Sequence, residues 1–249
     1  MDQVSGISCV NQVVTPEYAI YQGDSFELIR AIPGDSIHFG IHSPPFSGLY
    51  KFSNSDRDLS NSEGDDFFIH YTFLISELLR VTKPGRLCSV HVMQLPTSKT
   101  RHGFIGMRDF RGEVIRAYED AGWIFHSEVC IWKDPVVAQQ RTKSIRLLHK
   151  QITKDSTISG QGLADYIVTF RKPGENLEPV AGMFERFIGE GLDVSDEAYH
   201  RYCATPPAGS TNWKPWPLDM WRSVLVWQRY ASPVWSDINQ TRTLQYRNA

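Results

Sequence analysis

Four consecutive residues, Ser43-Pro44-Pro45-Phe46, bring together groups that could hold a planar molecule carrying an NH2. The Ser43 hydroxyl and the Pro44 carbonyl can both accept a hydrogen bond from such an amine, and the Phe46 ring can stack on its plane. The two prolines fix two φ angles and remove two backbone donors, so the turn is stiff and its carbonyls are free to accept. The alternative interpretation is an ordinary Pro-Pro loop that binds nothing.

The motif follows a segment, Ile37 to His42, that we expect to form a buried parallel strand, because no Lys, Glu or Asp interrupts it. Ligands of open α/β sheets bind beyond the carboxyl ends of strands. The position of Ser43 therefore favours the binding interpretation over the ordinary loop.

The rest of the chain alternates strand and helix patterns, which predicts an α/β fold. A long helix over Asp65 to Thr82 is indicated by apolar residues at helical spacing, with Lys83-Pro84-Gly85 ending it. His91 ends a predicted strand, and we expect a hydrogen-bonded core histidine there rather than a residue lining the site. The other predicted elements are strands at 18–21, 86–93, 123–132 and 165–171 and helices at 25–32 and 110–121, with 123–132 and 165–171 as an antiparallel pair at the sheet edge.

Ser43-Pro44-Pro45-Phe46 resembles the (Ser/Asp/Asn)-Pro-Pro-(Tyr/Phe) motif of S-adenosylmethionine-dependent amino-methyltransferases. Gly23-Asp24-Ser25 and the long helix after the motif are similar to those of the DNA methyltransferases that modify N4 of cytosine or N6 of adenine. The order of motifs resembles bacterial and phage enzymes, including those of restriction-modification systems, in which the catalytic motif comes first. The resemblance covers about residues 18 to 240.

The resemblance implies a Rossmann-like class I methyltransferase sheet, S-adenosylmethionine as cofactor and double-stranded DNA as partner. Asp24 and Ser43 would lie at the cofactor, although Asp24 also suits an N-cap role, with Glu27 three residues later. Ser43 and Pro44 would accept from the NH2 of a base flipped out of the duplex, with Pro45 stiffening the turn and Phe46 stacking on the base. Serine in the first motif position favours cytosine N4 over adenine N6.

The segment after the motif, 47–64, is polar and long, and is expected to be a loop over the site. Its Tyr50 and Phe52 either pack against the flipped base or belong to a surface loop without that role. A second segment, 139–154, contains five cations and no acid. If it is helical, Lys143, Arg146 and Lys150 share one face, and phosphate contacts are favoured over a merely solvated face. The predicted DNA-binding residues are Arg141, Lys143, Arg146, Lys150 and Lys154.

The character of the chain changes near residue 172, which predicts a catalytic region over 1–172 and a small irregular target-recognition region over 173–249. Five of the seven tryptophans fall within 213–235, and 221–230 is expected to contain a strand. The methyltransferases of this order carry a Phe-x-Gly-x-Gly loop after the recognition region. Phe187 to Gly191 spell that pattern without a preceding strand, so we interpret the match as coincidence. We therefore expect a sheet that is incomplete at its C-terminal side and weak binding of the cofactor by these 249 residues.

Composition excludes several classes. The chain is 41% hydrophobic and 22% charged, with a net charge of −2, so it is globular and any nucleic-acid contact must be local. The four cysteines are isolated, which argues against zinc and for a cytoplasmic location, and no run of about 20 apolar residues suggests a membrane span. The remaining alternatives are an inactive DNA-binding fragment and a methyltransferase of protein glutamine or RNA. The oligomeric state is not predicted.

Overall fold

The computed structural model describes residues 9–62, 64–184, 188 and 191–238. These fall into two compact units. The first runs to Asn176 and takes up the chain again at Val234, and the second comprises Leu177–Pro233. Each unit is described below by itself.

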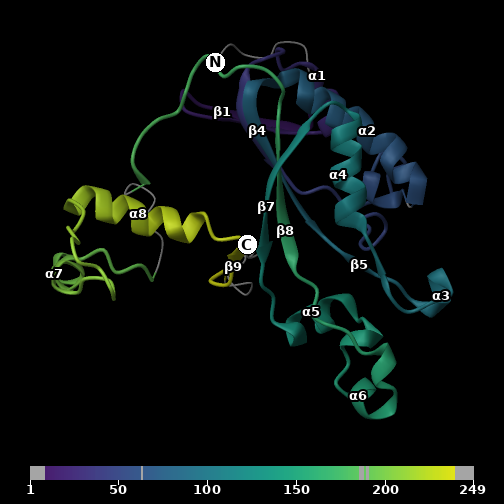
Figure 1. The fold of residues 1–249 in the computed structure, drawn as a ribbon. Helices are drawn as coiled ribbons and strands as arrows, with labels where there is room; N and C mark the ends of the chain where they lie inside the picture. Colours follow the sequence, from purple (N-terminus) through teal and green to yellow (C-terminus); the bar gives the residue numbers. More distant parts are fainter. Residues whose placement is uncertain (1–8, 63, 185–187, 189–190, 239–249) are drawn as a thin grey trace. The chain divides into compact units, whose positions relative to one another are not determined.

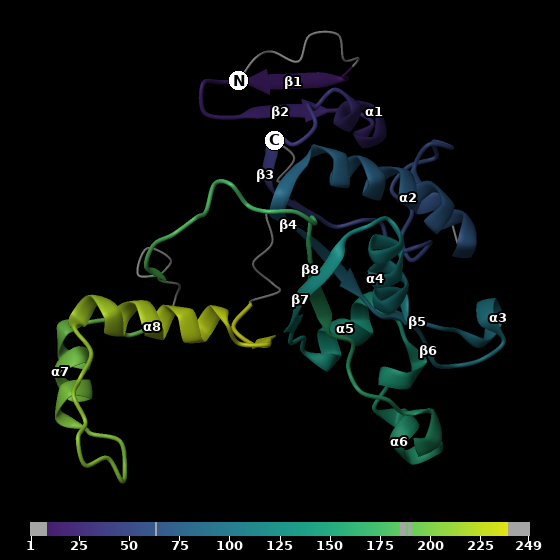
Figure 2. The ribbon, with the colours of Figure 1, turned by 45° about the horizontal axis from the view of Figure 1, so that its top comes forward.

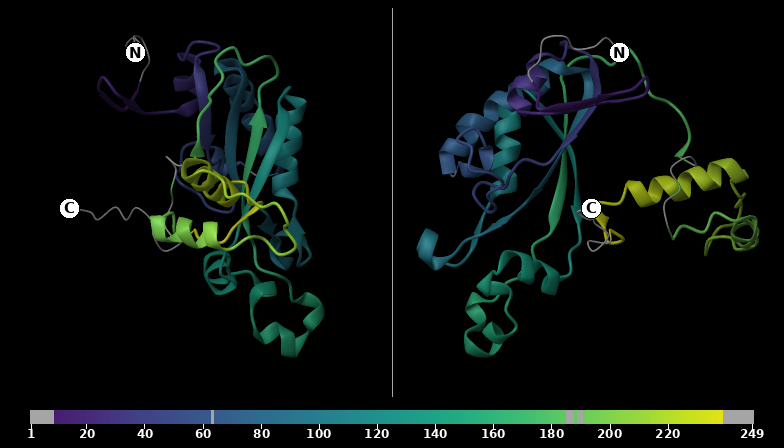
Figure 3. Two further views of the ribbon diagram at one scale, coloured as in Figure 1. Left: turned by 60° about the vertical axis from the view of Figure 1, so that its left-hand side comes forward. Right: turned by 180° about the vertical axis from the view of Figure 1, so that it is seen from behind.

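A five-stranded sheet organises the first unit, in the order β3-β4-β8-β7-β9. Its strands β3, β4, β7 and β9 run in one direction, and β8 runs opposite to both of its neighbours. Figure 3 shows β7 and β8 running side by side along their length. The strand bounds are β3 Ile37–His42, β4 Thr82–Met93, β7 Ile124–Ile131, β8 Asp165–Arg171 and β9 Val234–Trp235.

Two helices, α2 (Gly64–Val81) and α4 (Phe110–Asp120), lie side by side and pack against the sheet (Figure 1). The fully buried residues of α2, Phe67, Tyr71 and Ile75, recur every four positions, which is the spacing of one helix face. Tyr118 of α4 stacks on Phe170 of β8 with ring centroids 4.0 Å apart. Each such buried ring contributes about 1.5–3 kcal/mol through removal of apolar area from water.

Shorter elements frame this core. The hairpin of β1 (Asn11–Val14) and β2 (Ala19–Gln22) leads into α1 (Ser25–Arg30), which lies next to it (Figure 2). The strand β2 overlaps the predicted strand at 18–21, whereas β1 lies in the N-terminal stretch for which no element was predicted. The remaining elements of the first unit are η1 Leu59–Asn61, β5 Leu95–Pro96, α3 Lys99–His102, β6 Met107–Arg108, α5 Pro135–Thr142, η2 Ile145–Leu147, α6 Lys150–Lys154 and η3 Ser156–Ile158.

Two predictions about the sheet are wrong. The strand before the motif is parallel to its neighbour, but β3 forms the edge of the sheet and is not buried. Phe39 and Ile41, two residues apart and so on one face of β3, are 53% and 68% exposed. The pair β7–β8 is antiparallel as predicted but does not lie at the edge, since β8 is the central strand.

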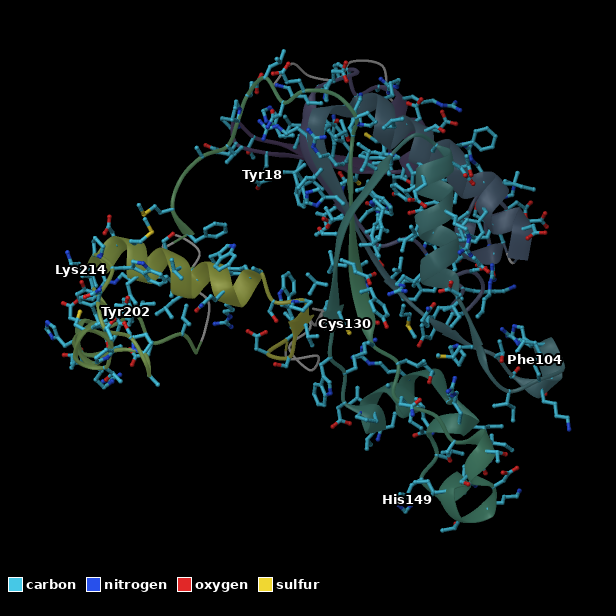
Figure 4. All side chains as sticks on the ribbon, viewed as in Figure 1. Tyr18, Phe104, Cys130, His149, Tyr202 and Lys214 are labelled. Carbon is cyan, nitrogen blue, oxygen red and sulfur yellow. The ribbon has the colours of Figure 1, made fainter. Side chains whose placement is uncertain are left out.

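In its described residues, the second unit contains two α-helices, α7 (Asp196–Ala204) and α8 (Leu218–Tyr230). The predicted strand within 221–230 is wrong, because that segment belongs to α8. Tyr202 of α7, labelled in Figure 4, lies 5.8 Å from Trp221 and 6.2 Å from Trp216, measured between ring centroids. Trp221 is buried in this aromatic cluster, at 5% exposed, whereas Trp216 and Trp227 are 46% and 49% exposed.

Candidate active site

The motif stands at the carboxyl end of β3, where Ser43, Pro44 and Pro45 line a cavity of about 790 Å³. Asp24, in the turn between β2 and α1, lines the same cavity. The two residues predicted to lie at the cofactor, Asp24 and Ser43, are thus brought together. The cavity walls are mostly apolar, with Tyr21, Phe26, Leu28, Ile29, Ile32, Leu59, Leu74 and Leu78 among them.

Asp24 has two structural partners at the rim of this cavity. Its side chain accepts a hydrogen bond from the Phe26 N–H at 2.9 Å, so the predicted N-cap of α1 is confirmed. Its other oxygen lies 2.8 Å from Arg57 Nε, and Arg57 also bonds Glu27 at 2.7 Å. Glu27 is therefore paired with the loop after the motif, and Arg57 holds that loop against the start of α1.

The sheet topology brings three further polar side chains to Ser43. Because β8 runs opposite to its neighbours, its first residue, Asp165, lies beside the carboxyl ends of β4 and β7. His91 stands near the end of β4, and Lys133 follows β7 by two residues. The contacts are Ser43 Oγ to His91 Nδ1 at 3.1 Å, His91 Nε2 to Asp165 Oδ2 at 3.1 Å, and Lys133 Nζ to Asp165 Oδ1 at 2.6 Å.

Asp165 and Lys133 are largely enclosed, with side chains 12% and 11% exposed. Burial acts to raise the pKa of Asp165, but the hydrogen bonds from His91 and Lys133 and their charges outweigh it, so the pKa lies below the usual range. The carboxyl is therefore ionised at neutral pH. Such a group can only accept hydrogen bonds, so Lys133 Nζ and His91 Nε2 are the donors in their contacts with it.

Phe46 faces a second, smaller cavity of about 130 Å³. His91, Lys133 and Asp165 line this cavity together with Phe46 and Tyr50. The Phe46 ring meets the His91 ring edge-on at 5.7 Å, and the Tyr50 hydroxyl donates to the Arg141 carbonyl at 3.1 Å. Phe52 does not line this cavity and is 71% exposed. The motif thus stands between two cavities, with Ser43 at the larger and Phe46 at the smaller.

A hydrogen-bonded cluster lies directly behind the motif. His42 Nε2 is 2.9 Å from the Tyr71 hydroxyl and 3.2 Å from the Tyr118 hydroxyl. Burial lowers the pKa of His42 to about 4, so this imidazole is neutral at physiological pH. Burial likewise raises the pKa of both tyrosines and that of the Cys88 thiol, the latter to about 12. The cluster supports the end of β3 without carrying charge.

The basic segment is not one helix. Lys143 ends α5 in the left-handed region at φ 52°, Arg146 lies in η2, and Lys150 begins α6. The prediction that these three cations share a helix face is therefore wrong, because the chain turns between them. Lys143, Lys150 and Lys154 are exposed, as is Arg141, whereas Arg146 packs its guanidinium on Gly160. His149, labelled in Figure 4, lies in the same segment, at the start of α6.

The Phe187 to Gly191 match lies largely outside the described residues. Within the described ranges, no helix has the length and apolar character needed to cross a membrane. Over the same residues, no group of three or more His, Cys, Asp or Glu side chains is arranged to hold a metal ion.

The sequence matches no protein-family profile and no curated protein. Solved structures do match. The chain is similar to a candidate DNA modification methylase, TTHA0409 of Thermus thermophilus, crystallised with S-adenosyl-L-methionine, at 16% identity and a TM-score of 0.52 over 87% of this chain and 65% of that one. It is also similar to the cytosine-N4-specific PvuII DNA methyltransferase, at 16% identity and a TM-score of 0.42 over 62% of this chain and 50% of the other.

The similarity to TTHA0409 shows the fold. The chain has the Rossmann-like α/β fold of class I methyltransferases, as predicted, with a mixed central sheet. The chain covers about 65% of the length of the TTHA0409 structure.

Ser43 and Asp24 were both predicted from the sequence to lie at the cofactor. Asp165 and Lys133 were not predicted to belong to the site, and His91 was expected to be a core residue. The available signal was Asp165 itself, an acid that begins a predicted strand with an apolar centre, Tyr166 to Val168. Recognising it required knowing that this strand lies antiparallel between β4 and β7, which puts its first residue at the site.

Proposed function

We propose that this chain is an S-adenosylmethionine-dependent methyltransferase that acts on the exocyclic amine of a base in double-stranded DNA. The observation that carries the proposal is the position of Ser43-Pro44-Pro45-Phe46 at the carboxyl end of β3, between a large, mostly apolar cavity and a small one lined by aromatic rings. A donor in one cavity and a planar acceptor in the other would meet at this motif. The similar fold of TTHA0409, which was crystallised with S-adenosyl-L-methionine, supports the assignment.

The larger cavity fits the cofactor. Its volume of about 790 Å³ lies within the range of small-molecule sites. Leu28, Leu74 and Leu78 offer apolar surface for a purine ring, and Asp24 offers a carboxylate to hydroxyl or amino groups. His42 also lines the cavity, and its Nδ1 is buried without a partner among the described residues. When bound there, S-adenosylmethionine supplies an electrophilic methyl group.

The chain's own residues prepare the acceptor amine. The Ser43 hydroxyl and the Pro44 carbonyl accept from the NH2, which draws its lone pair out of conjugation with the ring and toward the methyl. Phe46 and Tyr50 hold the ring plane in the smaller cavity. The methylated nitrogen is cationic and its proton is strongly acidic, so it passes to water without a strong base, and orientation and electrostatics supply most of the rate.

The base has to leave the duplex to reach this site. A cavity of about 130 Å³ has room for a single planar base. Serine at the first motif position favours cytosine N4 over adenine N6. Arg141, which lies at the smaller cavity, and the exposed Lys143, Lys150 and Lys154 would contact phosphates, and Arg146 is expected to contribute less because it packs on Gly160. Residues 1–172 would then be the catalytic region and 173–249 the target-recognition region.

Methyl transfer tests the proposal directly. DNA is incubated with the chain and methyl-labelled S-adenosylmethionine, digested to nucleosides and separated by chromatography. We expect label in N4-methylcytosine, and at least a tenfold loss of transfer in Ser43→Ala, which corresponds to about 1.4 kcal/mol of transition-state binding. Ser36→Ala is the matched control, because Ser36 precedes the other end of β3 and its hydroxyl donates to the Pro33 carbonyl, away from the motif.

Three results separate the alternatives. Label in N6-methyladenine would overturn the choice of base but keep the reaction. Label in RNA or in protein glutamine with none in DNA would assign a different acceptor to the same site. No transfer by the wild type, or unchanged transfer by Ser43→Ala, would contradict the proposal.

A further inference from the structure

The contacts around Ser43 determine which way its hydroxyl proton points. Asp165 is ionised and accepts from Lys133 and from His91 Nε2. Nε2 therefore carries a proton, and in the neutral imidazole Nδ1 is then a bare acceptor. Ser43 Oγ lies 3.1 Å from that nitrogen, and in this tautomer the hydroxyl is the donor of the pair.

A second acceptor reinforces this direction. The backbone carbonyl of His91 lies 3.3 Å from Ser43 Oγ, so both acceptors for the hydroxyl proton belong to the same residue. The Phe46 ring, edge-on to the imidazole at 5.7 Å, packs against His91 and limits its rotation. The proton of Ser43 is thereby held toward His91, and its lone pairs are left for a ligand.

This direction matters for the chemistry of an amine. A serine hydroxyl that is free to rotate can donate to an NH2 as readily as it accepts from it. Donation would occupy the nitrogen lone pair, which is the electron pair that has to attack the methyl group. A hydroxyl that can only accept instead leaves that pair available.

We propose that His91 is a positioning residue that fixes the Ser43 hydroxyl as a hydrogen-bond acceptor for the substrate amine, with Asp165 and Lys133 fixing His91 in turn. The inference rests on the proposed function for the identity of the amine. It adds that the site selects ligands that offer N–H to Ser43 over ligands that offer only a lone pair there.

Two substitutions of His91 separate this role from a structural one. His91→Asn can place an amide oxygen near the position of Nδ1 and so keep an acceptor for Ser43, whereas His91→Gln extends its amide toward the position of Nε2. We expect His91→Asn to keep kcat within about threefold of the wild type, and His91→Gln to lose about tenfold in kcat with KM for DNA unchanged, as loss of one oriented hydrogen bond predicts. Equal losses in both variants, or a loss confined to KM, would overturn the proposal.

A second measurement does not depend on methyl transfer. Nitrogen-15 NMR of the imidazole side chains distinguishes the two neutral tautomers, with His91 assigned by its absence from His91→Asn. We expect a protonated Nε2 and a bare Nδ1 for His91 in the wild type and in Ser43→Ala, and loss of this preference in Asp165→Asn. A proton on Nδ1 would overturn the inference, since His91 would then donate to Ser43. If methyl transfer is absent but the tautomer is as expected, the proposed function fails while the orientation of Ser43 stands.

Discussion

Replacing Lys133 by Met should strongly destabilise the first unit, because it removes the cation from an enclosed ion pair and leaves the anion behind. Lys133 Nζ lies 2.6 Å from Asp165 Oδ1, and both side chains are nearly buried. Breaking a buried pair by removal of one partner typically costs about 3–5 kcal/mol. His91 still donates to Asp165 in the variant, so we expect about 3 kcal/mol, the lower end of that range.

The loss should depend on pH with a definite sign. The folded-state pKa of Asp165 is lowered in the wild type, so its contribution to stability is present above the unfolded pKa of about 3.9 and is lost as pH falls through the folded value. In Lys133→Met, burial is opposed by His91 alone, and the pKa of Asp165 rises relative to the wild type. The difference in unfolding free energy between the two proteins should therefore be largest near neutral pH and shrink as pH falls toward and below about 4.

Urea unfolding followed by tryptophan fluorescence and circular dichroism measures this difference. Lys172→Met is the matched control, because Lys172 Nζ also lies 2.6 Å from a carboxylate, that of Asp35, which is 60% exposed. The Lys172 side chain is 16% exposed, but Met keeps most of its apolar stem, and the carboxylate left behind is in water. A pair of this kind is worth about 0–1 kcal/mol, so the control should change little. Equal effects of the two substitutions, or a loss at Lys133 that is independent of pH, would refute the reasoning.

Three further predictions concern other parts of the molecule. His42→Gln should flatten the pH dependence of the unfolding free energy between about pH 6.5 and 4. In the wild type the folded pKa of His42 is about 4, so the unfolded chain takes up a proton at higher pH than the folded chain does, and the protein loses about 3 kcal/mol of stability over that window. Urea unfolding at several pH values across the window measures the difference. Gly85→Ala should lower the free energy of unfolding by more than about 2 kcal/mol, since φ is 71° and a Cβ would lie 2.7 Å from the Asn176 nitrogen. Gly103→Ala is the control: its φ is 78° but a Cβ would enter open space, so thermal unfolding should show a loss of about 1 kcal/mol. Replacing Lys143, Lys150 and Lys154 by Gln should weaken DNA binding at every sequence and reduce the slope of log K against log salt by about 0.9 per lost phosphate contact, measured by fluorescence anisotropy; an unchanged slope would assign these lysines to a solvated surface.

Local patterns predicted the elements well where one face is buried. The α2 stripe of Phe67, Tyr71 and Ile75 and the apolar run of β8 are both legible in the sequence, because burial on the sheet selects them. The motif at Ser43 could be found because its prolines and its position after a strand have a direct physical meaning. The position of Ile37–His42 at the outside of the sheet could not be predicted from its sequence, since that position depends on the order of all the strands.

The partners of Ser43 were beyond local patterns for the same reason. His91 and Asp165 lie far apart in the sequence and meet only because β8 runs against its neighbours. Trp221 to Tyr230 were mistaken for a strand because aromatic and β-branched residues favour strands, whereas the Tyr199 and Tyr202 rings of α7 give Trp221 a helical packing partner. The assumption of one helix over the basic segment 139–154 was wrong for a different reason. Lys143 adopts a left-handed backbone conformation, which ends α5 and divides the segment.

The central claim is that the cavity ending at Ser43 holds the methyl donor, and ligand-observed saturation-transfer NMR with S-adenosylmethionine tests it most directly, since this measurement also detects weak binding. Ser25→Trp places an indole in the cavity from an exposed position at the start of α1. Thr153→Trp, at an exposed position of α6, is the control. The account predicts a signal for the wild type and for Thr153→Trp, with affinity at least tenfold lower in Ser25→Trp. No binding by the wild type, or equal binding by Ser25→Trp, would contradict it.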